Sequence, residues 1–498
     1  MNVNPITRLD YPDPDVIRVE DTYYMVSTTM HFMPGCEILQ SFDLVHWEHA
    51  TYVYETLDHT DAQQLKSGQN IYGQGMWAAS LRYHEGRFYI CFVANDTRKT
   101  YLYTSEKIDG PWKKQLIEGF YHDGSLLFDE DGRNYIVYGN DEIWITELNE
   151  DLTAPKKDGL HRLLVSDHKN PELGYEGSHI QKINGYYYIF LVHSLRDRWM
   201  RTEACFYSDS LEGEFTGGDV LCDDRGYCGQ GVAQGGIVDT PDGKWYAMLF
   251  QDSGAVGRIP ILLPVTWKDH FPVFGQNGHV PEEIEVHSTR TGYIYQPLVG
   301  SDDFCNGLLP RWQFNHDPDP RYYHLDALQG TYTITTREVC TELTQAVNTL
   351  TQRMSYPSCA AEVTVDASAL KEGDVAGLCA LQSCYAAVGI TKHHGKYEVL
   401  MLDKKEDGIL DMTEGIVVES HQIDFRLEAD FCNMKDEARC YYRVNKGDWL
   451  PIGNVHKLYF KLDHFTGCRF GLFCYAAEET GGSACFRDFK YYDVDEIS

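Results

Sequence analysis

The sequence is short of positive charge. It contains 43 lysines and arginines against 75 aspartates and glutamates, which gives a formal net charge of −32 at pH 7. A chain of this charge repels nucleic-acid phosphates and anionic lipids, so neither nucleic acid nor a membrane is expected as a partner. An uncharged ligand fits this balance better.

Long apolar runs are lacking as well. No stretch of the 498 residues approaches the length that crosses a bilayer. Residues 1–15, MNVNPITRLDYPDPD, have neither the basic nor the apolar region of a secretory signal peptide. We therefore expect a cytoplasmic protein.

The 15 cysteines do not form the spaced pairs of a disulfide framework. They are odd in number and are scattered singly, as in the apolar runs around Cys91 and Cys474, which is typical of reduced core thiols. Cys222 and Cys228 come closest to a metal-binding pair, but five residues separate them and no second pair follows. A zinc site is not expected.

Aromatic residues, in contrast, are abundant. They make up 13% of the chain, with 34 tyrosines, and hydrophobic residues make up 43%. This composition favours strands and surfaces that stack on flat ligands. The length is too great for one ordinary core, so we expect two domains of unequal size.

Five segments share one design. Each has a short strand, then a tight turn with Gly or Asp, then an aromatic pair and an apolar strand, which is hairpin chemistry. The aromatic anchors recur at intervals of roughly 45 to 65 residues, the spacing of four-stranded propeller blades. These anchors are Tyr24, Tyr89, Tyr135, Tyr187 and Tyr246. The repeat predicts an all-β fold that begins with a five-bladed β-propeller.

The same repeat predicts a functional site. The first strand of each propeller blade begins near the central axis, so residues at one offset before each anchor should form a ring. Stepping back about 11 or 12 residues from each anchor reaches Asp13, Trp77, Asp123, Glu176 and Gln234. Three carboxylates, an indole and an amide should therefore meet at one opening. Such crowding raises the pKa of at least one carboxylate, which is typical of an active site.

Paired carboxylates beside an aromatic ring are the equipment of glycoside hydrolysis, and the sequence has no phosphate loop, nucleophile elbow or metal-ligand cluster. Asp13 lies between Pro12 and Pro14, which restrict its direction and suit it to the role of base. Glu176 has the longer reach expected of a proton donor. Asp123 would raise the pKa of this acid and orient it.

At this point the chain resembles glycoside hydrolase family 43, whose members are five-bladed propellers with an Asp base, an Asp modulator and a Glu acid. The resemblance rests on YPDPDVIRV, HDGSLLFDEDGRNYIVYG, YEGSHIQKINGYYYIF, GQGMWAASLRY and GAVGRIP. It implies a base at Asp13, a modulator at Asp123, an acid at Glu176, a sugar-stacking Trp77 and an active-site Arg258.

From about residue 302 the chain changes to alternating strands with turn signals, which predicts a β-sandwich. This part resembles the concanavalin-A-like jelly roll that accompanies β-xylosidases of the family. We expect a catalytic propeller over residues 1–296 and a sandwich over residues 302–498. In such relatives the second domain closes one side of the pocket, which implies exo-action on short chains.

The chain departs from the family pattern at two positions. Gln234 stands where the family often has a histidine linked to a metal ion, and an amide binds soft metals poorly. No cofactor is therefore expected to be required, while calcium, which accepts oxygen ligands, stays compatible. Met30 stands where related xylosidases often place a phenylalanine against the sugar, so it is either a substrate contact or plain packing. His179 reaches the funnel only if the strand alternation is broken.

The leading interpretation is an inverting exo-glycosidase that releases terminal β-D-xylose from short xylo-oligosaccharides. An α-L-arabinofuranosidase, or one enzyme with both activities, is the nearest alternative, because the two terminal sugars have similar shapes. A retaining fructosidase is disfavoured, since its NDPNG and RDP stretches are absent. A non-catalytic sugar-binding propeller is the alternative from another class. The expected partner is a small oligosaccharide, and the sequence is compatible with a homo-oligomer.

Overall fold

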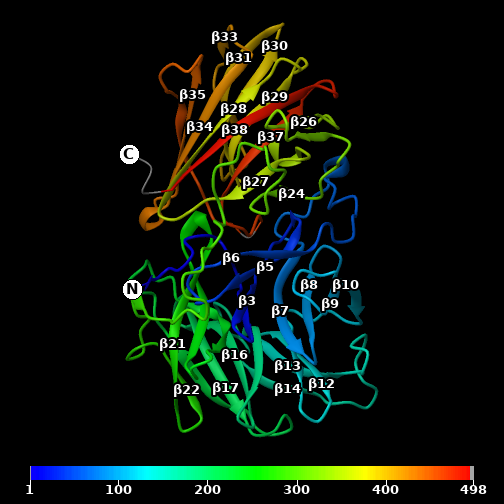
Figure 1. Cartoon of the computed structure of the whole chain (residues 1–498), viewed down its shortest axis with the longest axis vertical. Helices are drawn as coiled ribbons and strands as arrows, with labels where there is room; N and C mark the ends of the chain where they lie inside the picture. Colours follow the sequence, from blue (N-terminus) through cyan, green and yellow to red (C-terminus); the bar gives the residue numbers. More distant parts are fainter. Residues whose placement is uncertain (1, 462, 494–498) are drawn as a thin grey trace.

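A computed structural model describes residues 2–461 and 463–493. It consists of two all-β parts stacked along the long axis of the molecule, with the N-terminal part below and the C-terminal part above (Figure 1). The helices among the described residues are single 3-10 turns: η1 (Lys66–Gly68), η2 (Gly254–Val256), η3 (Leu343–Gln345) and η4 (Cys432–Met434). None of these helices has the length and apolarity of a membrane span.

Five four-stranded antiparallel sheets form the N-terminal part, and each is built from consecutive stretches of the chain. The predicted five-bladed propeller is therefore confirmed. The blades are β2 (Asp15–Val19), β3 (Thr22–Val26), β5 (Gly35–Ser41) and β6 (Glu48–Tyr54); β7 (Met76–His84), β8 (Arg87–Ala94), β9 (Lys99–Ser105) and β10 (Lys113–Ile117); β11 (Ser125–Phe128), β12 (Asn134–Asn140), β13 (Glu142–Leu148) and β14 (His161–Ser166); β15 (Glu176–Ile183), β16 (Tyr186–Ser194), β17 (Arg201–Ser208) and β18 (Thr216–Leu221); and β19 (Ala233–Asp239), β20 (Trp245–Asp252), β21 (Arg258–Lys268) and β22 (Phe271–Phe274).

The predicted hairpins explain why the chain folds in this way. Glu85 and Gly86 join β7 to β8, and Asn184 and Gly185 join β15 to β16; all four residues have positive φ. This is the backbone of a type I′ turn, whose twist matches that of the two flanking strands. The five tyrosine anchors all lie on the second strand of their blade.

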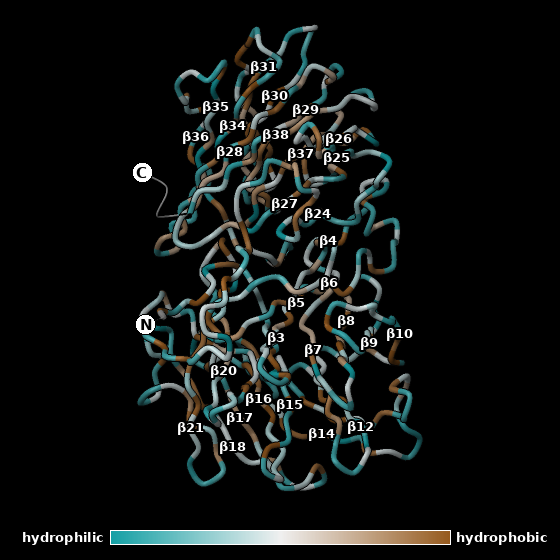
Figure 2. Tube along the Cα trace, viewed as in Figure 1, coloured by the Kyte–Doolittle hydropathy of each residue, from teal (hydrophilic) through white to brown (hydrophobic). Residues whose placement is uncertain are grey.

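Hydrophobic cores between neighbouring blades close the propeller into a ring. One core joins the first two blades, the next three join the blades that follow, and the last returns from the fifth blade to the first, where Val238 and Met248 pack with Tyr11 and Val16. Figure 2 shows the hydrophobic stretches along the strands and the hydrophilic ones at the turns. A short pair, β1 (Asn2–Val3) with β23 (Glu283–Ile284), also joins the beginning of the propeller to its end.

Two antiparallel sheets face each other in the C-terminal part and enclose one large hydrophobic core, as the predicted sandwich requires. One sheet contains β24 (Gln313–Asn315), β27 (Leu350–Arg353), β29 (Asp374–Leu381), β30 (Ala386–His393), β31 (Lys396–Lys404), β32 (Leu410–Met412), β33 (Ile416–Val418) and β37 (Arg469–Ala476). The other contains β25 (Tyr323–Asp326), β26 (Thr331–Thr335), β28 (Ser358–Asp366), β34 (Gln422–Asp430), β35 (Glu437–Val444), β36 (Leu450–Lys457) and β38 (Ser483–Asp493).

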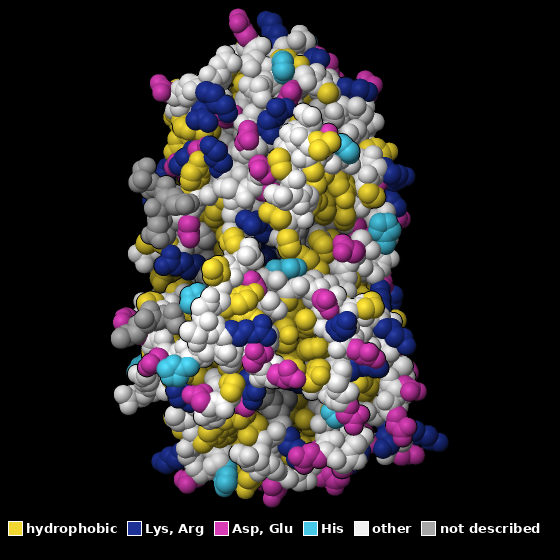
Figure 3. All heavy atoms as spheres, viewed as in Figure 1, with side chains coloured by type: hydrophobic (Ala, Val, Ile, Leu, Met, Phe, Trp, Pro, Cys, Tyr) yellow, Lys and Arg dark blue, Asp and Glu magenta, His cyan; other side chains and the backbone are white. Residues whose placement is uncertain are grey.

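The two parts share backbone and side-chain contacts. Strand β4 (Phe32–Met33) belongs to the propeller segment but pairs with β24, so one sandwich sheet continues into the propeller. A buried ion pair between Glu37 and Arg353 (2.9 Å) also crosses the junction. On the face drawn in Figure 3, acidic and basic side chains are interspersed over both parts.

The predicted state of the cysteines agrees with the structure. All 15 are free, and Cys91 and Cys474 are buried in hydrophobic cores. Cys222 and Cys228 are both exposed. The structure therefore places these thiols as separate side chains, most of them packed as small apolar groups.

Candidate active site

The predicted ring lies where the innermost strands of the blades begin. Asp13 and Asp123 come just before β2 and β11, and Glu176 opens β15. Trp77 and Gln234 lie near the starts of β7 and β19, within register shifts that also occur in β15 after Glu176. Such bulges turn side chains out of the normal alternation and are frequent beside active sites. Asp13, Asp123 and Gln234 also have left-handed φ values of 52°, 48° and 65°.

Asp13 is held by two side chains. Its Oδ1 accepts a hydrogen bond from Nη1 of Arg258 (2.7 Å), and its Oδ2 accepts one from Oγ1 of Thr28 (2.6 Å). Only 5% of the residue is exposed. The carboxylate is therefore fixed in direction, as the two flanking prolines predict.

Arg258 is buried and does not lie on the surface. Besides Asp13, its guanidinium faces Asp252 across 3.4 Å and lies 4.6 Å from the ring centre of Phe465. Asp252 also pairs with a second buried arginine, Arg201 (2.5 Å). Sequence reasoning missed Arg201, because nothing in RTEACFYS separates an inward arginine from a strand-edge cation.

Asp123 and Glu176 are joined through the backbone. Oδ2 of Asp123 accepts a hydrogen bond from the N–H of Gly177, the residue after Glu176 (2.9 Å). Gly177 has a φ of +66°, and a Cβ there would lie 2.7 Å from Cγ of Gln234. Only glycine fits this turn. Oε2 of Glu176 accepts a hydrogen bond from Nδ2 of Asn140 (2.8 Å).

His122 lies between these two carboxylates and was missed by sequence reasoning. Its Nε2 is 3.5 Å from Oδ2 of Asp123 and 3.5 Å from Oε2 of Glu176. Burial opposes its charge, but the two carboxylates outweigh burial and raise the pKa of His122 to about 9. The available signal was its place directly before Asp123 in HDGS.

The pKa values of Asp123 and Glu176 are shifted in opposite directions. Burial raises the pKa of Asp123 to about 6, against the charge of His122. Burial also tends to raise the pKa of Glu176, but the hydrogen bond and charge of His122, helped by Arg201 and Arg258, lower it overall. In the free protein at neutral pH, the proton that His122, Asp123 and Glu176 share therefore resides on His122.

Aromatic rings from both parts of the molecule wall the site. Trp77 is half-buried, and its ring centre lies 5.8 Å from that of His122 and 5.5 Å from that of Phe465. Phe465 belongs to the sandwich loop that precedes β37, so the second domain does cover one side of the site. The resemblance to the family implied this cover but not the residue that provides it.

Met30 and Gln234 are both buried. Met30 is 1% exposed and exchanges backbone hydrogen bonds with Met76 (3.0 and 3.1 Å), which fits plain packing, while the sugar contact stays a prediction. Gln234 is 4% exposed, and its N–H donates to Oε2 of Glu203 (2.7 Å). Burial raises the pKa of Glu203 well above its usual value, which favours the neutral carboxyl. The ring position of Gln234 is therefore buried against a further carboxyl, that of Glu203.

One group of described residues could hold a metal ion. The ligand atoms of His122, Asp123 and Glu176 all lie within 4.8 Å of one another. A cation there would have to displace the proton on His122 and would occupy a carboxylate oxygen of Glu176. The same atoms cannot serve a metal and a proton donor at once, so no step of the chemistry below uses a metal.

His179 lies farther down the propeller channel. The register shift in β15 breaks the strand alternation between Glu176 and His179, which is the condition for an inward His179. Its Nδ1 lies 3.0 Å from Oδ1 of Asp15, whose Oδ2 accepts from the N–H of Leu81 and from Arg82 (2.7 Å each). This buried network joins the first, second and fourth blades.

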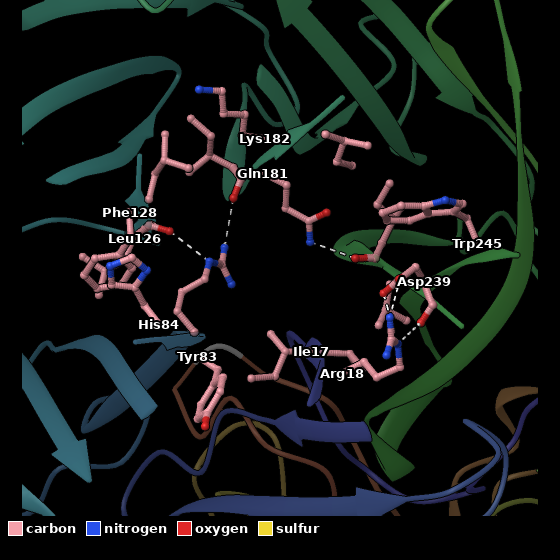
Figure 4. A pocket seen from close by; sticks show the side chains of 17 residues that line it. Ile17, Arg18, Tyr83, His84, Leu126, Phe128, Gln181, Lys182, Asp239 and Trp245 are labelled. Atoms are coloured by element: carbon pink, nitrogen blue, oxygen red, sulfur yellow. Dashed lines mark hydrogen bonds and ion pairs between the residues drawn. The ribbon is translucent and has the colours of Figure 1, made fainter. Parts of the chain in front are cut away.

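A cavity of about 420 Å³ occupies the opposite mouth of the channel and is lined by the far ends of the inner strands (Figure 4). Its charged groups are already paired, since Arg18 reaches Asp239 (2.5 Å) and Lys182 reaches Asp129 (2.7 Å). None of the predicted site residues lines it. The convergent carboxylates are at the other mouth.

Comparisons with known proteins agree with this architecture. Residues 3–272 match the model of "Glycosyl hydrolases family 43", and residues 301–492 match "Beta xylosidase C-terminal Concanavalin A-like domain". A solved structure from Bacteroides eggerthii, described as "Bifunctional GH43-CE", is 42% identical, with a TM-score of 0.93 over 100% of this chain and 64% of that one. The chain thus spans less than two thirds of that relative.

Curated relatives of similar length are more distant. A "Beta-xylosidase" from Formosa agariphila is 26% identical over 99% of this chain and 89% of the relative. A "Xylosidase/arabinosidase" from Butyrivibrio fibrisolvens is 24% identical over 99% of both chains. The family model matches more than half of the sequence, and the blades place the three carboxylates at one opening. The chain therefore belongs to glycoside hydrolase family 43.

Proposed function

We propose that this member of the family is an inverting, exo-acting hydrolase that releases terminal β-D-xylose from short xylo-oligosaccharides. The observation that carries the proposal is the pairing of Asp13, fixed by Arg258, with an Asp123–Glu176 unit from two other blades. Two carboxyl groups that face one pocket from different sides can act as a base and an acid.

In the proposed reaction a water molecule attacks the anomeric carbon and gives its proton to Asp13. Glu176 transfers a proton to the departing glycosidic oxygen, so the carbon–oxygen bond breaks as the new one forms. The sugar leaves with the opposite anomeric configuration. Asp13 then releases the proton that it took from the water, and solvent returns a proton to Glu176.

In this proposal His122 holds the proton that Glu176 later donates. It is charged in the free protein and lies 3.5 Å from the Glu176 carboxylate. A sugar that displaces water from the pocket makes separate charges costlier, which favours movement of the proton from His122 to Glu176. Asp123 keeps Glu176 in place through the N–H of Gly177.

The walls of the site support action on a chain end. Trp77 offers an aromatic face, and Phe465 approaches it from the sandwich. A pocket covered on one side leaves room for a terminal sugar better than for the middle of a polymer. The relatives described as a β-xylosidase and as a xylosidase/arabinosidase agree with a pentose at this position.

An α-L-arabinofuranosidase, or an enzyme with both activities, is the second candidate. The name "Xylosidase/arabinosidase" of one full-length relative favours it, and the two terminal sugars present similar shapes to such a pocket. The carboxylate chemistry is the same for both sugars, so the difference lies in how each one fits against the wall that Trp77 and Phe465 form together.

Aryl β-xyloside and aryl α-L-arabinofuranoside, assayed side by side with xylobiose and polymeric xylan, test the proposal. We expect the highest kcat/KM on the xyloside, xylose as the product from xylobiose, and little release from xylan. A reversed preference selects the arabinofuranosidase. Internal cuts in xylan contradict exo-action, and calorimetric binding of xylobiose without turnover of any substrate identifies a sugar-binding propeller.

A further inference from the structure

Asp10 lies three residues before the proposed base, and its buried carboxylate contacts two other parts of the molecule. Oδ1 accepts a hydrogen bond from the backbone N–H of Arg258 (2.7 Å). Oδ2 accepts one from the N–H of Gly467 in the sandwich loop (2.9 Å). The residue is 4% exposed. One carboxylate thus joins the segment of the base, the strand of the active-site arginine and the second domain.

The hydrogen bonds between residues 10–13 and Arg258 form a closed set. The N–H of Tyr11 donates to the carbonyl of Arg258 (3.0 Å), in the opposite sense to the bond that Asp10 accepts from that residue. From there Nη1 of Arg258 reaches Asp13 (2.7 Å), with only Tyr11 and Pro12 between the two aspartates. The backbone of Arg258 is therefore fixed relative to the carboxylate that its guanidinium orients.

The sandwich side of the contact is tightly packed. A Cβ on Gly467 would lie 2.2 Å from the carbonyl oxygen of Val256 and 2.8 Å from Cβ of Asp10. The next residue, Cys468, donates its N–H to the carbonyl of Ala255 (2.8 Å). The loop therefore rests directly on the backbone that leads to Arg258.

Phe465 is the functional part of this loop. It lies two residues before Gly467, and its ring is 5.5 Å from Trp77 and 4.6 Å from the guanidinium of Arg258. The position of the aromatic cover thus depends on where the Gly467 backbone is held. Asp10 supplies a charge-assisted hydrogen bond at that point, the stronger kind for a backbone donor.

We propose that Asp10 is a positioning residue that couples the second domain to the reaction, seating Phe465 over the pocket and aligning Arg258 with Asp13 through one carboxylate. The kinetic consequences of this role rest on the proposed function, whereas the position of the loop does not depend on which sugar is cleaved. Asp10 itself touches neither the substrate nor the reacting atoms.

Asp10→Asn is the first test, because the amide keeps the size but replaces one acceptor oxygen by a donor that faces an N–H. We expect faster hydrogen–deuterium exchange in peptides that cover residues 463–470 and a rise in KM. We also expect a loss of kcat/KM of roughly 10- to 100-fold, as for a misplaced catalytic group. The exchange measurement needs no turnover, so it reports on the inference even if no pentoside is cleaved.

Asp302→Asn is the matched control. Asp302 is 5% exposed, and its two oxygens accept N–H groups of Phe304 (2.7 Å) and Trp312 (2.8 Å) within the sandwich. It should lower the melting temperature as Asp10→Asn does, without changing KM or exchange in the loop. Equal kinetic losses in the two variants would mean that Asp10 is merely structural.

Gly467→Ala approaches the same contact from the other domain and covers the case in which Asp10→Asn does not fold. It displaces the loop but keeps the Asp10 carboxylate that accepts the N–H of Arg258. We expect a rise in KM and faster loop exchange with a smaller loss of kcat than in Asp10→Asn. In a Phe465→Ala background the KM effect of Asp10→Asn should vanish. A KM effect that persists there, or loop exchange that stays unchanged in both variants, overturns the proposal.

Discussion

Asp123 accepts a hydrogen bond from the backbone N–H of Gly177, the residue that follows Glu176 (2.9 Å). This bond joins the segment before β11 to the start of β15, so two carboxyl groups from neighbouring blades keep a fixed offset. His122 occupies the space between them, 3.5 Å from each. The three titratable groups therefore behave as one unit, while Asp13 has its own partner in Arg258.

Replacement of Glu176 should depend on the leaving group. We expect Glu176→Ala to slow xylobiose cleavage by roughly 10²-fold to 10⁴-fold, the range of a lost general acid. An aryl xyloside with an acidic phenol should lose much less, because that phenol departs without a proton. The ratio of the two rates measures the effect. A ratio that stays at the unmodified value removes Glu176 from the role of acid.

Replacement of Asp13 should not depend on the leaving group. Every substrate waits for the same attack by water, so Asp13→Ala should slow xylobiose and the aryl xyloside alike, by at least about 10²-fold. Asp239→Asn, at the far mouth of the channel, is the control and should retain normal rates. If Asp13→Ala instead raises the ratio of aryl to xylobiose rates, the acid and base assignments must be exchanged.

The propeller was predictable because its signal is repeated. Each blade has a hairpin turn and an aromatic anchor, so five weak patterns support one architecture and place Asp13, Asp123 and Glu176 at one opening. Left-handed φ values and register shifts at the strand starts carry the side chains inward. The offset of these residues from the anchors is therefore visible in the sequence.

The rest of the site comes from contacts without such periodicity. His122 owes its importance to two carboxylates from different blades, and Phe465 comes from a domain that follows the propeller in sequence. Met30 was a candidate through the resemblance to the family, and the contacts that bury it to 1% exposure come from other segments of the chain. Apart from the place of His122 directly before Asp123, local sequence holds no record of these contacts, because they join separate blades or separate domains.

Chelation should leave most of the activity intact. Gln234 is buried beside a carboxyl, Glu203, whose neutral form is favoured, and the convergent ligand atoms of His122, Asp123 and Glu176 are needed for proton transfer. Prolonged treatment with EDTA, followed by assay on the aryl xyloside with and without added calcium, measures the effect. A large loss that calcium reverses would show that a hard cation is required.

The anomeric configuration of the first product should be inverted. Asp13 and Glu176 belong to separate blades, and we expect their carboxyl groups to be about 6.5 to 9.5 Å apart, which leaves room for a water molecule. Proton NMR during early hydrolysis of a β-xyloside should then show α-xylose before mutarotation produces the β form. Initial β-xylose would require a covalent intermediate and would contradict the proposed mechanism.

Replacement of His122 should move the basic limb of the pH profile to lower pH. In the free protein the proton that the acid uses resides on His122, whose pKa is raised to about 9, so the unmodified enzyme keeps this proton well above neutral pH. Without the imidazole, the proton must be held by the Glu176 carboxyl itself, and a carboxyl loses its proton at lower pH than this imidazole does. In His122→Gln the basic limb of kcat/KM should therefore lie at lower pH than in the unmodified enzyme, and the maximal rate should fall as well. His84→Asn, at the far mouth of the channel, is the control and should leave the profile unchanged. A basic limb that stays in place or moves to higher pH in His122→Gln would show that His122 does not hold the proton that the acid uses.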